Sequence, residues 1–295
     1  MTTLHTAVNP PAAATATRRL TAWLQRHPLW GYGLLAYGIS WLFLLGALVA
    51  IQFDLLPADS PIMGVANQIA AFGPALAALI VIAYTQGRTG VRQWLRRLVQ
   101  WRVGIQWYLL ILFGIPLISL LGASVLHGMR PFQALVEQWP ILFTRYLPYV
   151  ALTTVLTGLA EEPGWRGFAQ PRFQAQHGPL LGTLLASLLW SFWHLPNLFF
   201  QPGGLYTFSL WFAATMVNGF VLAWVYNATK GSVLLVMLLH AAQNVTSSLV
   251  GNLLGATDAV QFMNEYYVVS AITYGVLIGI VILVTRGRLG NRATG

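Results

Sequence analysis

Three short clusters of polar residues hold the side chains of this 295-residue chain that are best suited to chemistry. They are Glu161-Glu162-Pro163-Gly164-Trp165-Arg166, Trp190-Ser191-Phe192-Trp193-His194 and His240-Ala241-Ala242-Gln243-Asn244. A carboxylate can serve as general base, an imidazole can orient a water, and ring or amide N–H groups can stabilise a developing oxyanion. Two histidines and a glutamate can alternatively bind Zn²⁺ and lower the pKa of a bound water.

The spacing in the first cluster predicts different roles for its two carboxylates. Adjacent residues on a helix diverge by about 100°, so Glu161 and Glu162 face different directions. Glu162 stands four residues before Arg166, which is the favourable order for an ion pair. We therefore expect Glu162 to be the tethered carboxylate and Glu161 the free one. Pro163 biases Glu162 away from helical angles, and a kink there would leave this division of roles open.

The composition places these clusters in a membrane. Hydrophobic residues make up 57% of the chain and charged residues only 8%, whereas soluble domains carry about 25% charged residues. This balance argues against a soluble enzyme and against a nucleic-acid-binding domain. The absence of cysteine excludes disulfides, Fe–S clusters and a cysteine nucleophile.

Eight largely uncharged runs predict an all-α bundle of about eight transmembrane helices. They are Leu29–Ile51, Ile62–Tyr84, Gly104–Leu126, Tyr146–Ala160, Leu180–Phe200, Leu205–Tyr226, Ser232–Leu254 and Tyr266–Thr285. We expect one transmembrane domain over residues 29–285, with a disordered cytoplasmic tail over residues 1–28 and a basic cytoplasmic tail over residues 286–295. Short interfacial helices should accompany the spans, including an amphipathic helix over Arg88–Arg102.

The charged residues predict the orientation of these spans. If the N-terminus is inside, 14 of the 16 basic residues fall in inside segments, and only Arg130 and Arg145 fall outside. Such an excess of lysine and arginine is typical of cytoplasmic loops. The net charge of +9 is thus explained by topology and anionic lipids, without nucleic acid. We expect an integral protein of the plasma membrane with both termini in the cytoplasm.

The polar clusters lie at membrane depth, where charged groups are costly and usually mark a functional site. At 1.5 Å per residue, His240 lies ~12 Å and His194 ~21 Å from the inner face. Glu161 reaches a comparable depth only if its helix continues towards Gln170. Asn244 shares a helix face with His240 because they are four residues apart. We therefore expect Glu161, both histidines and Asn244 to line one water-filled cavity.

The clusters resemble the sequence motifs of the CPBP family of intramembrane proteases, which process CAAX proteins and bacteriocins. This family is also called Abi or type II CAAX prenyl endopeptidase-like. Its first motif, Glu-Glu-x-x-x-Arg, is matched by Glu161, Glu162 and Arg166. Its second motif, Phe-x-x-x-His, is matched by His194, with Trp190 in the place of the phenylalanine.

The third motif, His-x-x-x-Asn, is matched by His240 and Asn244, and the motif region covers roughly residues 145–250. The resemblance implies an endopeptidase that acts inside the membrane, in a cavity open to the cytoplasm. It also implies catalytic roles for the matched residues of all three motifs. Its substrates would be peptides or membrane proteins, including prenylated CAAX-like ones. A zinc site formed by Glu161, His194 and His240 and a metal-free glutamate mechanism are both compatible with the resemblance.

Three other functions would use the same residues. A non-catalytic relative would bind a peptide or act as an immunity membrane protein, and only an activity assay separates it from a protease. A proton-coupled transporter would relay protons through the glutamate and histidines, but it predicts paired repeats with discontinuous helices, which are not evident here. A membrane cytochrome would use His194 and His240 as axial haem ligands and would be coloured.

The orientation can be tested with reporter fusions. We expect fusions after Gly90 and after Gly295 to report a cytoplasmic location, because the basic residues gather in the segments around them. A periplasmic or extracellular location at either position would contradict the predicted topology.

Overall fold

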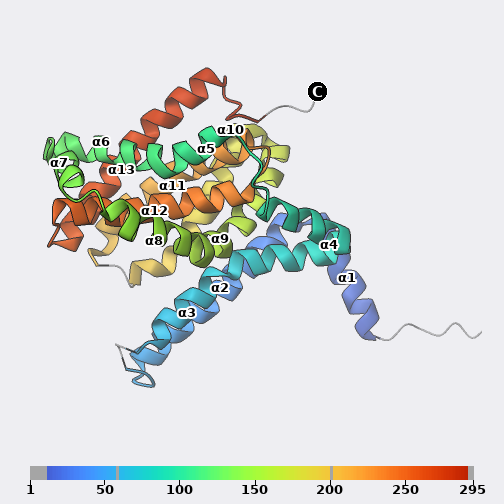
Figure 1. The fold of residues 1–295 in the computed structure, drawn as a ribbon. Helices are drawn as coiled ribbons and strands as arrows, with labels where there is room; N and C mark the ends of the chain where they lie inside the picture. Colours follow the sequence, from blue (N-terminus) through green and yellow to red (C-terminus); the bar gives the residue numbers. More distant parts are fainter. Residues whose placement is uncertain (1–11, 58–59, 200–201, 292–295) are drawn as a thin grey trace, which may run out of the picture.

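The computed structural model describes residues 12–57, 60–199 and 202–291, and these residues form helices and connecting turns with no strand (Figure 1). The α-helices are α1 Ala12–Arg26, α2 Pro28–Gln52, α3 Ile62–Ala71, α4 Gly73–Leu98, α5 Ile105–Leu109, α6 Ile115–His127, α7 Arg130–Glu137, α8 Leu147–Thr153, α9 Leu159–Gly164, α10 Gln170–Trp193, α11 Gly204–Ala228, α12 Val233–Leu254 and α13 Ala259–Val284. Single π-helical turns lie at Leu110–Gly114, Leu142–Tyr146, Thr154–Gly158 and Trp165–Ala169, and a 3₁₀ turn lies at Leu195–Phe199. The predicted all-α fold class is confirmed.

Six helical segments of the described chain are long and apolar enough to cross a membrane. They are Pro28–Gln52, Ile62–Leu98, Ile105–His127, Gly204–Ala228, Val233–Leu254 and Ala259–Val284. They correspond to six of the eight predicted spans, and the protein is an integral membrane protein. The predicted fourth span lies in a helical run from residue 142 to residue 193, which is divided by π-helical turns and by Gly178. This run carries the first polar cluster and the second as far as Trp193, and the predicted fifth span, Leu180–Phe200, continues beyond its end.

The expected disordered tail over residues 1–28 is wrong for residues 12–26, which form α1. This helix packs against α2 and α4, and Leu24 is buried there. Leu20 and Trp23 remain exposed, so among the described side chains Leu24 is the one that anchors the helix to its neighbours. Residues 1–11 of the expected tail, and the last four residues of the basic tail, lie outside the described part of the chain.

Two glycines with positive φ divide long helices near the boundaries that the sequence predicts. Gly87, with φ of 62°, separates the apolar part of α4 from the segment beginning at Arg88. This division agrees with a separate amphipathic helix, while its place on the membrane surface stays a prediction. Gly178, with φ of 76°, divides α10 two residues before Leu180, the predicted start of the fifth span.

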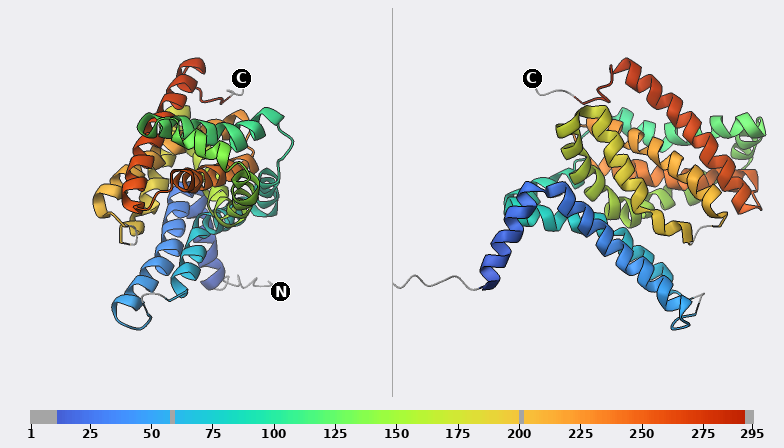
Figure 2. Two further views of the ribbon diagram at one scale, coloured as in Figure 1. Left: turned by 60° about the vertical axis from the view of Figure 1, so that its left-hand side comes forward. Right: turned by 180° about the vertical axis from the view of Figure 1, so that it is seen from behind.

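Helix α12 is the centre of the bundle, because it is buried over more of its length than the other five candidate spans. It contacts α6, α8, α9 and α11. Helices α2 and α3 run side by side and extend away from this bundle (Figures 1 and 2). The carbonyl oxygens of Leu189 and Trp193 in α10 accept hydrogen bonds from Tyr37 and Trp41 of α2, at 2.5 and 2.8 Å. These bonds attach the extending layer to the bundle.

The segments with most of the basic residues meet at one end of the molecule, here called the basic end. The end of α4 contacts the end of α11, where Arg97 donates a hydrogen bond to the Tyr226 hydroxyl at 2.9 Å. The Ser232 hydroxyl at the start of α12 donates to the Gln100 carbonyl at 2.7 Å. Asn227 donates to the carbonyl of Leu289, which follows α13, at 3.2 Å.

The other end of the bundle, here called the opposite end, holds the α6–α7, α10–α11 and α12–α13 connections. His127 and Glu265 pair there at 3.2 Å, and the Asp258 carboxylate caps α13. The acidic residues at this end and the basic residues at the other reproduce the predicted division of charge. Which end faces the cytoplasm stays a prediction.

The helix that carries the two glutamates packs so closely on α4 that Gly164 has no space for a side chain. A Cβ there would lie 2.5 Å from the Pro74 carbonyl group. We expect Gly164→Ala to lower the free energy of unfolding by ~1–3 kcal/mol, as overpacking does, and to lower the melting temperature in detergent. Gly46→Ala in α2 is the control, because no atom lies within 4 Å of its added Cβ. Equal melting temperatures for the two variants would contradict this account of the packing.

Candidate active site

A buried ionic network ties the first polar cluster to the third. Glu162 is fully buried, and Arg166 Nη1 donates hydrogen bonds to its Oε1 and Oε2 at 3.0 and 3.1 Å. His240 on α12 donates from Nδ1 to Glu162 Oε1 at 2.7 Å. Because Nδ1 is occupied in this way, Nε2 is the ring atom of His240 that remains for other contacts. The geometry agrees with the prediction that Glu162 is the tethered carboxylate.

The helix continues past Pro163 instead of ending there. Helix α9 leads into the π-helical turn Trp165–Ala169 and then into α10 at Gln170. The Pro163 carbonyl oxygen accepts a hydrogen bond from Trp94 Nε1 of α4 at 3.0 Å. The prediction that this helix runs towards Gln170 is therefore confirmed. The continuity keeps the two glutamate side chains on different faces.

Glu161 is also buried, with 5% of its surface exposed, and it is held by a tryptophan. Trp190 Nε1 donates to Glu161 Oε2 at 2.9 Å, while the Arg166 guanidinium lies over the Trp190 ring, 4.3 Å from its centroid. Trp190 thus contacts both sides of the site, through its N–H edge and its ring face. The sequence did not predict this contact. The sequence does carry a tryptophan where the family motif has a phenylalanine. This exchange could have indicated a hydrogen bond at the position, because an indole has an N–H donor and a phenyl ring has none.

His194 ends α10 and is oriented by its own helix. Its Nδ1 donates to the Trp190 carbonyl oxygen at 2.9 Å, because a carbonyl can only accept. The rings of Trp193 and Trp211 stand edge-on to the imidazole, each with centroids 4.6 Å away. This hydrogen bond places the proton of the neutral ring on Nδ1 and leaves Nε2 as an acceptor.

Four of the predicted site residues line a single cavity of about 330 Å³, namely Glu161, His194, His240 and Asn244. The prediction that these four residues line one cavity is therefore confirmed. Glu162 and Arg166 do not line the cavity and lie behind its wall. Further polar lining side chains, which the sequence did not single out, are Asn197, Thr215, Asn218, Gln243, Ser247, Tyr266, Tyr267, Ser270 and Tyr274.

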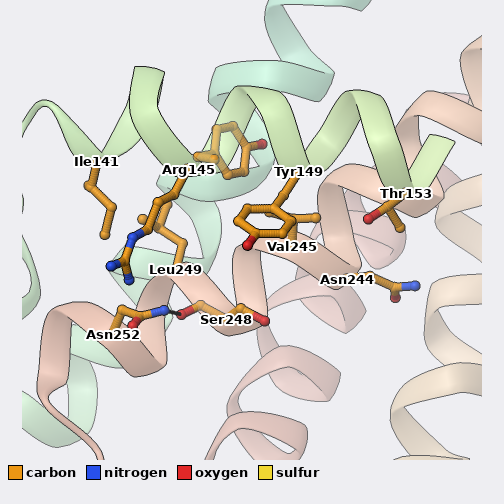
Figure 3. Close-up of a pocket in the computed structure, with 10 residues that line it drawn as sticks. Ile141, Arg145, Tyr149, Thr153, Asn244, Val245, Ser248, Leu249 and Asn252 are labelled. Carbon is orange, nitrogen blue, oxygen red and sulfur yellow. Dashed lines mark hydrogen bonds between the residues drawn. The ribbon is translucent and has the colours of Figure 1, made fainter. Parts of the chain in front are cut away.

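A second groove, of about 570 Å³, meets this cavity at Asn244 and lies between α12 and the segment 141–153. Figure 3 shows Arg145 and Tyr149 from that segment opposite Ser248 and Asn252, and Thr153 opposite Asn244. Sequence reasoning did not find this groove. Its lining residues come from two segments about a hundred positions apart in the chain, and apart from Asn244 they belong to no motif.

The positions of the site residues do not form a metal site. Among the described residues, no three histidine, cysteine, aspartate or glutamate side chains are grouped so that they could hold a metal ion. Both histidine Nδ1 atoms and one Glu161 oxygen already bond to protein groups. Because no such group is present among the described residues, the donor set as placed does not fit a three-ligand zinc site. The bonds at Nδ1 do not bear on this fit, since metal-binding histidines are oriented by the same kind of bond. The Zn²⁺ prediction remains to be tested.

Fold and site together define an integral membrane helix bundle with a buried glutamate and two histidines around a cavity. The family described as Type II CAAX prenyl endopeptidase Rce1-like matches residues 143–246 of the chain. A protein of Methanococcus maripaludis named CAAX prenyl protease 2 is 23% identical over 190 residues, which cover 60% of this chain and 69% of that protein. These matches confirm the resemblance drawn from the motifs. The chain is thus similar to CAAX prenyl endopeptidases over the region that carries its three polar clusters.

The Trp190 hydrogen bond can be removed while its aromatic ring is kept. We expect Trp190→Phe to reduce kcat by about ten-fold with little change in KM, because a bond to a charged group contributes ~1.5–3 kcal/mol. Trp193→Phe is the matched control, since within the described structure its buried Nε1 has no hydrogen-bond partner. Equal kcat for Trp190→Phe and Trp193→Phe, measured on peptide cleavage, would argue against a role for the N–H.

Proposed function

We propose that this protein hydrolyses peptide bonds inside the membrane with a water that Glu161 activates. The observation that carries the proposal is the shared cavity of Glu161, His194, His240 and Asn244, with Glu162 held behind it. One carboxylate is thus committed to a buried ion pair while the other faces the cavity. This arrangement separates the structural acid from the reacting one.

Glu161 acts as the general base. Trp190 holds Oε2, so Oε1 accepts the proton from the water. His194 accepts the second hydrogen bond of that water at Nε2, since its Nδ1–H is directed to the Trp190 carbonyl. The water oxygen bonds to the peptide carbonyl carbon, and the electron pair of the C=O bond moves onto the oxygen. A positioned base of this kind contributes about 100- to 10,000-fold to a rate.

The tetrahedral oxyanion is stabilised from α12. Asn244 donates from its amide, and protonated His240 donates from Nε2 while its Nδ1–H remains on Glu162. One preorganised donor of this kind is worth ~3–4 kcal/mol. The oxyanion's electron pair then re-forms the C=O bond as the C–N bond breaks, Glu161 returns its proton to the leaving nitrogen, and a carboxylic acid and an amine are released.

The substrates are peptides or membrane-protein segments that enter the bilayer. Prenylated CAAX-like peptides are the first candidates, because the Methanococcus maripaludis relative is named a CAAX prenyl protease. We place the protein in the plasma membrane with both termini in the cytoplasm, in keeping with its basic residues.

The proposal is tested with detergent-purified protein on a peptide library that includes prenylated CAAX-like peptides. We expect Glu161→Gln to lower kcat/KM by about 100-fold or more with unchanged yield of folded protein, because it removes the base and keeps the shape. Cleavage at the wild-type rate by Glu161→Gln would contradict the proposal. A wild-type protein that binds peptides without cleaving any of them would identify a non-catalytic relative.

Adding a chelator to the cleavage assay tests whether the activity needs a metal. The metal-free mechanism predicts that chelator leaves the cleavage rate of the wild-type protein unchanged. Loss of cleavage in chelator, with recovery on adding Zn²⁺, would assign a metal to the site and overturn the metal-free mechanism.

A further inference from the structure

Helix α12 carries a row of polar side chains that leads away from the catalytic cavity. Asn244, Ser248 and Asn252 stand four residues apart, and all three line the second groove. Each of the three is exposed, whereas His240, four residues before Asn244, is buried. Polar side chains inside a membrane span are costly and usually line a path for a polar substrate. The row therefore indicates that a polar ligand extends from the catalytic cavity into the groove.

The facing wall of the groove presents a cation. Arg145 projects from the segment 141–153 towards Asn252, and Tyr149 stands between Arg145 and Thr153 (Figure 3). The Arg145 side chain is exposed, and among the described residues no carboxylate lies within ion-pair distance of it. The other described residues that line the groove are uncharged. The electrostatics of the groove therefore favour a ligand with a negative charge near Arg145.

The length of the groove matches a short stretch of extended peptide. Asn252 lies eight residues after Asn244, which corresponds to ~12 Å along α12. Arg145 stands opposite Asn252, so its guanidinium lies about as far from Asn244 along the groove. Extended peptide spans ~3.3–3.6 Å per residue. A peptide whose reacting carbonyl lies at Asn244 thus reaches Arg145 with a residue only a few positions further along.

The charge at Arg145 determines which end of a peptide fits there. A free peptide end is either an ammonium group or a carboxylate. A guanidinium repels the first and binds the second through two parallel hydrogen bonds. The Tyr149 and Ser248 hydroxyl groups lie between Asn244 and Arg145, and they can bond to the peptide groups of the ligand. The groove is therefore suited to the C-terminal fragment that leaves after cleavage.

We propose that Arg145 binds the C-terminal carboxylate of the substrate and so directs cleavage to bonds close to a free chain end. Arg145 is then a specificity-determining residue, remote from the chemistry at Glu161. The inference rests on the proposed proteolytic function. The chemistry of the groove is the same whichever end of the bundle faces the cytoplasm.

Two peptides that differ only at their last atoms test the role of Arg145. One prenylated CAAX-like peptide is made with a free C-terminal carboxylate and also as the C-terminal carboxamide. Cleavage of both is measured for the wild-type protein, Arg145→Gln, Arg145→Lys and Arg130→Gln. Arg130 is the matched control, because it is an exposed arginine that does not line the groove. Thermal unfolding in detergent verifies that each variant is folded.

We expect the wild-type protein to cleave the carboxylate peptide with a kcat/KM about ten-fold above that of the carboxamide, mainly through a lower KM. Arg145→Gln should lower kcat/KM for the carboxylate peptide to the carboxamide value and leave the carboxamide value unchanged. Arg145→Lys should keep part of the preference, because it keeps the positive charge, and Arg130→Gln should keep all of it.

An equal loss for both peptides in Arg145→Gln would assign the side chain to folding or to a lipid headgroup and overturn the proposal. Equal cleavage of the two peptides by the wild-type protein would also overturn it and leave the proteolytic function intact. Binding of the same peptides with a fluorescent label, followed by anisotropy, needs no cleavage. A preference for the carboxylate that Arg145→Gln abolishes, in a protein that cleaves neither peptide, would contradict the proposed function and leave the carboxylate site intact.

Discussion

Glu162 is a carboxylate with no exposed surface inside a membrane protein, and its charge is compensated by two partners from different parts of the chain. Arg166 comes from the next turn of the same helical run, and His240 comes from α12, the central helix of the bundle. A buried charge left without partners costs several kcal/mol. The network therefore fixes how the helical run 159–169 sits against α12. The other features of the site depend on that fixed contact.

Trp190 links this ionic network to the residues that line the cavity. Its ring face receives the Arg166 cation, its N–H edge holds Glu161, and its carbonyl oxygen orients His194. The His240 ring also stands edge-on to it, with centroids 5.5 Å apart. One side chain and its backbone thus connect the structural acid, the proposed base and both histidines. A phenylalanine would keep the contact with the cation and lose the bond to the base.

The sequence predicted those features of the fold and the site that depend on local periodicity and charge. The apolar runs predicted membrane helices, the four-residue spacing predicted the pair of Glu162 with Arg166, and the motif order predicted the shared cavity. What the sequence could not predict depends on tertiary packing. The helix over residues 12–26 packs on α2 and α4 and buries Leu24 there, and the bond from Trp190 to Glu161 requires two helices to meet at one distance. The groove at Arg145 likewise exists only once distant segments are assembled.

Glu162 and Arg166 stabilise the folded protein as a coupled pair, and a double-mutant cycle on the free energy of unfolding measures this directly. The single variants are Glu162→Gln and Arg166→Met, and the double variant carries both. Each single change leaves one buried charge without its partner, whereas the double change removes both charges. We expect the double variant to lose about 1–3 kcal/mol less unfolding free energy than the two single variants lose in sum. Simple additivity, with a coupling energy near zero, would contradict it.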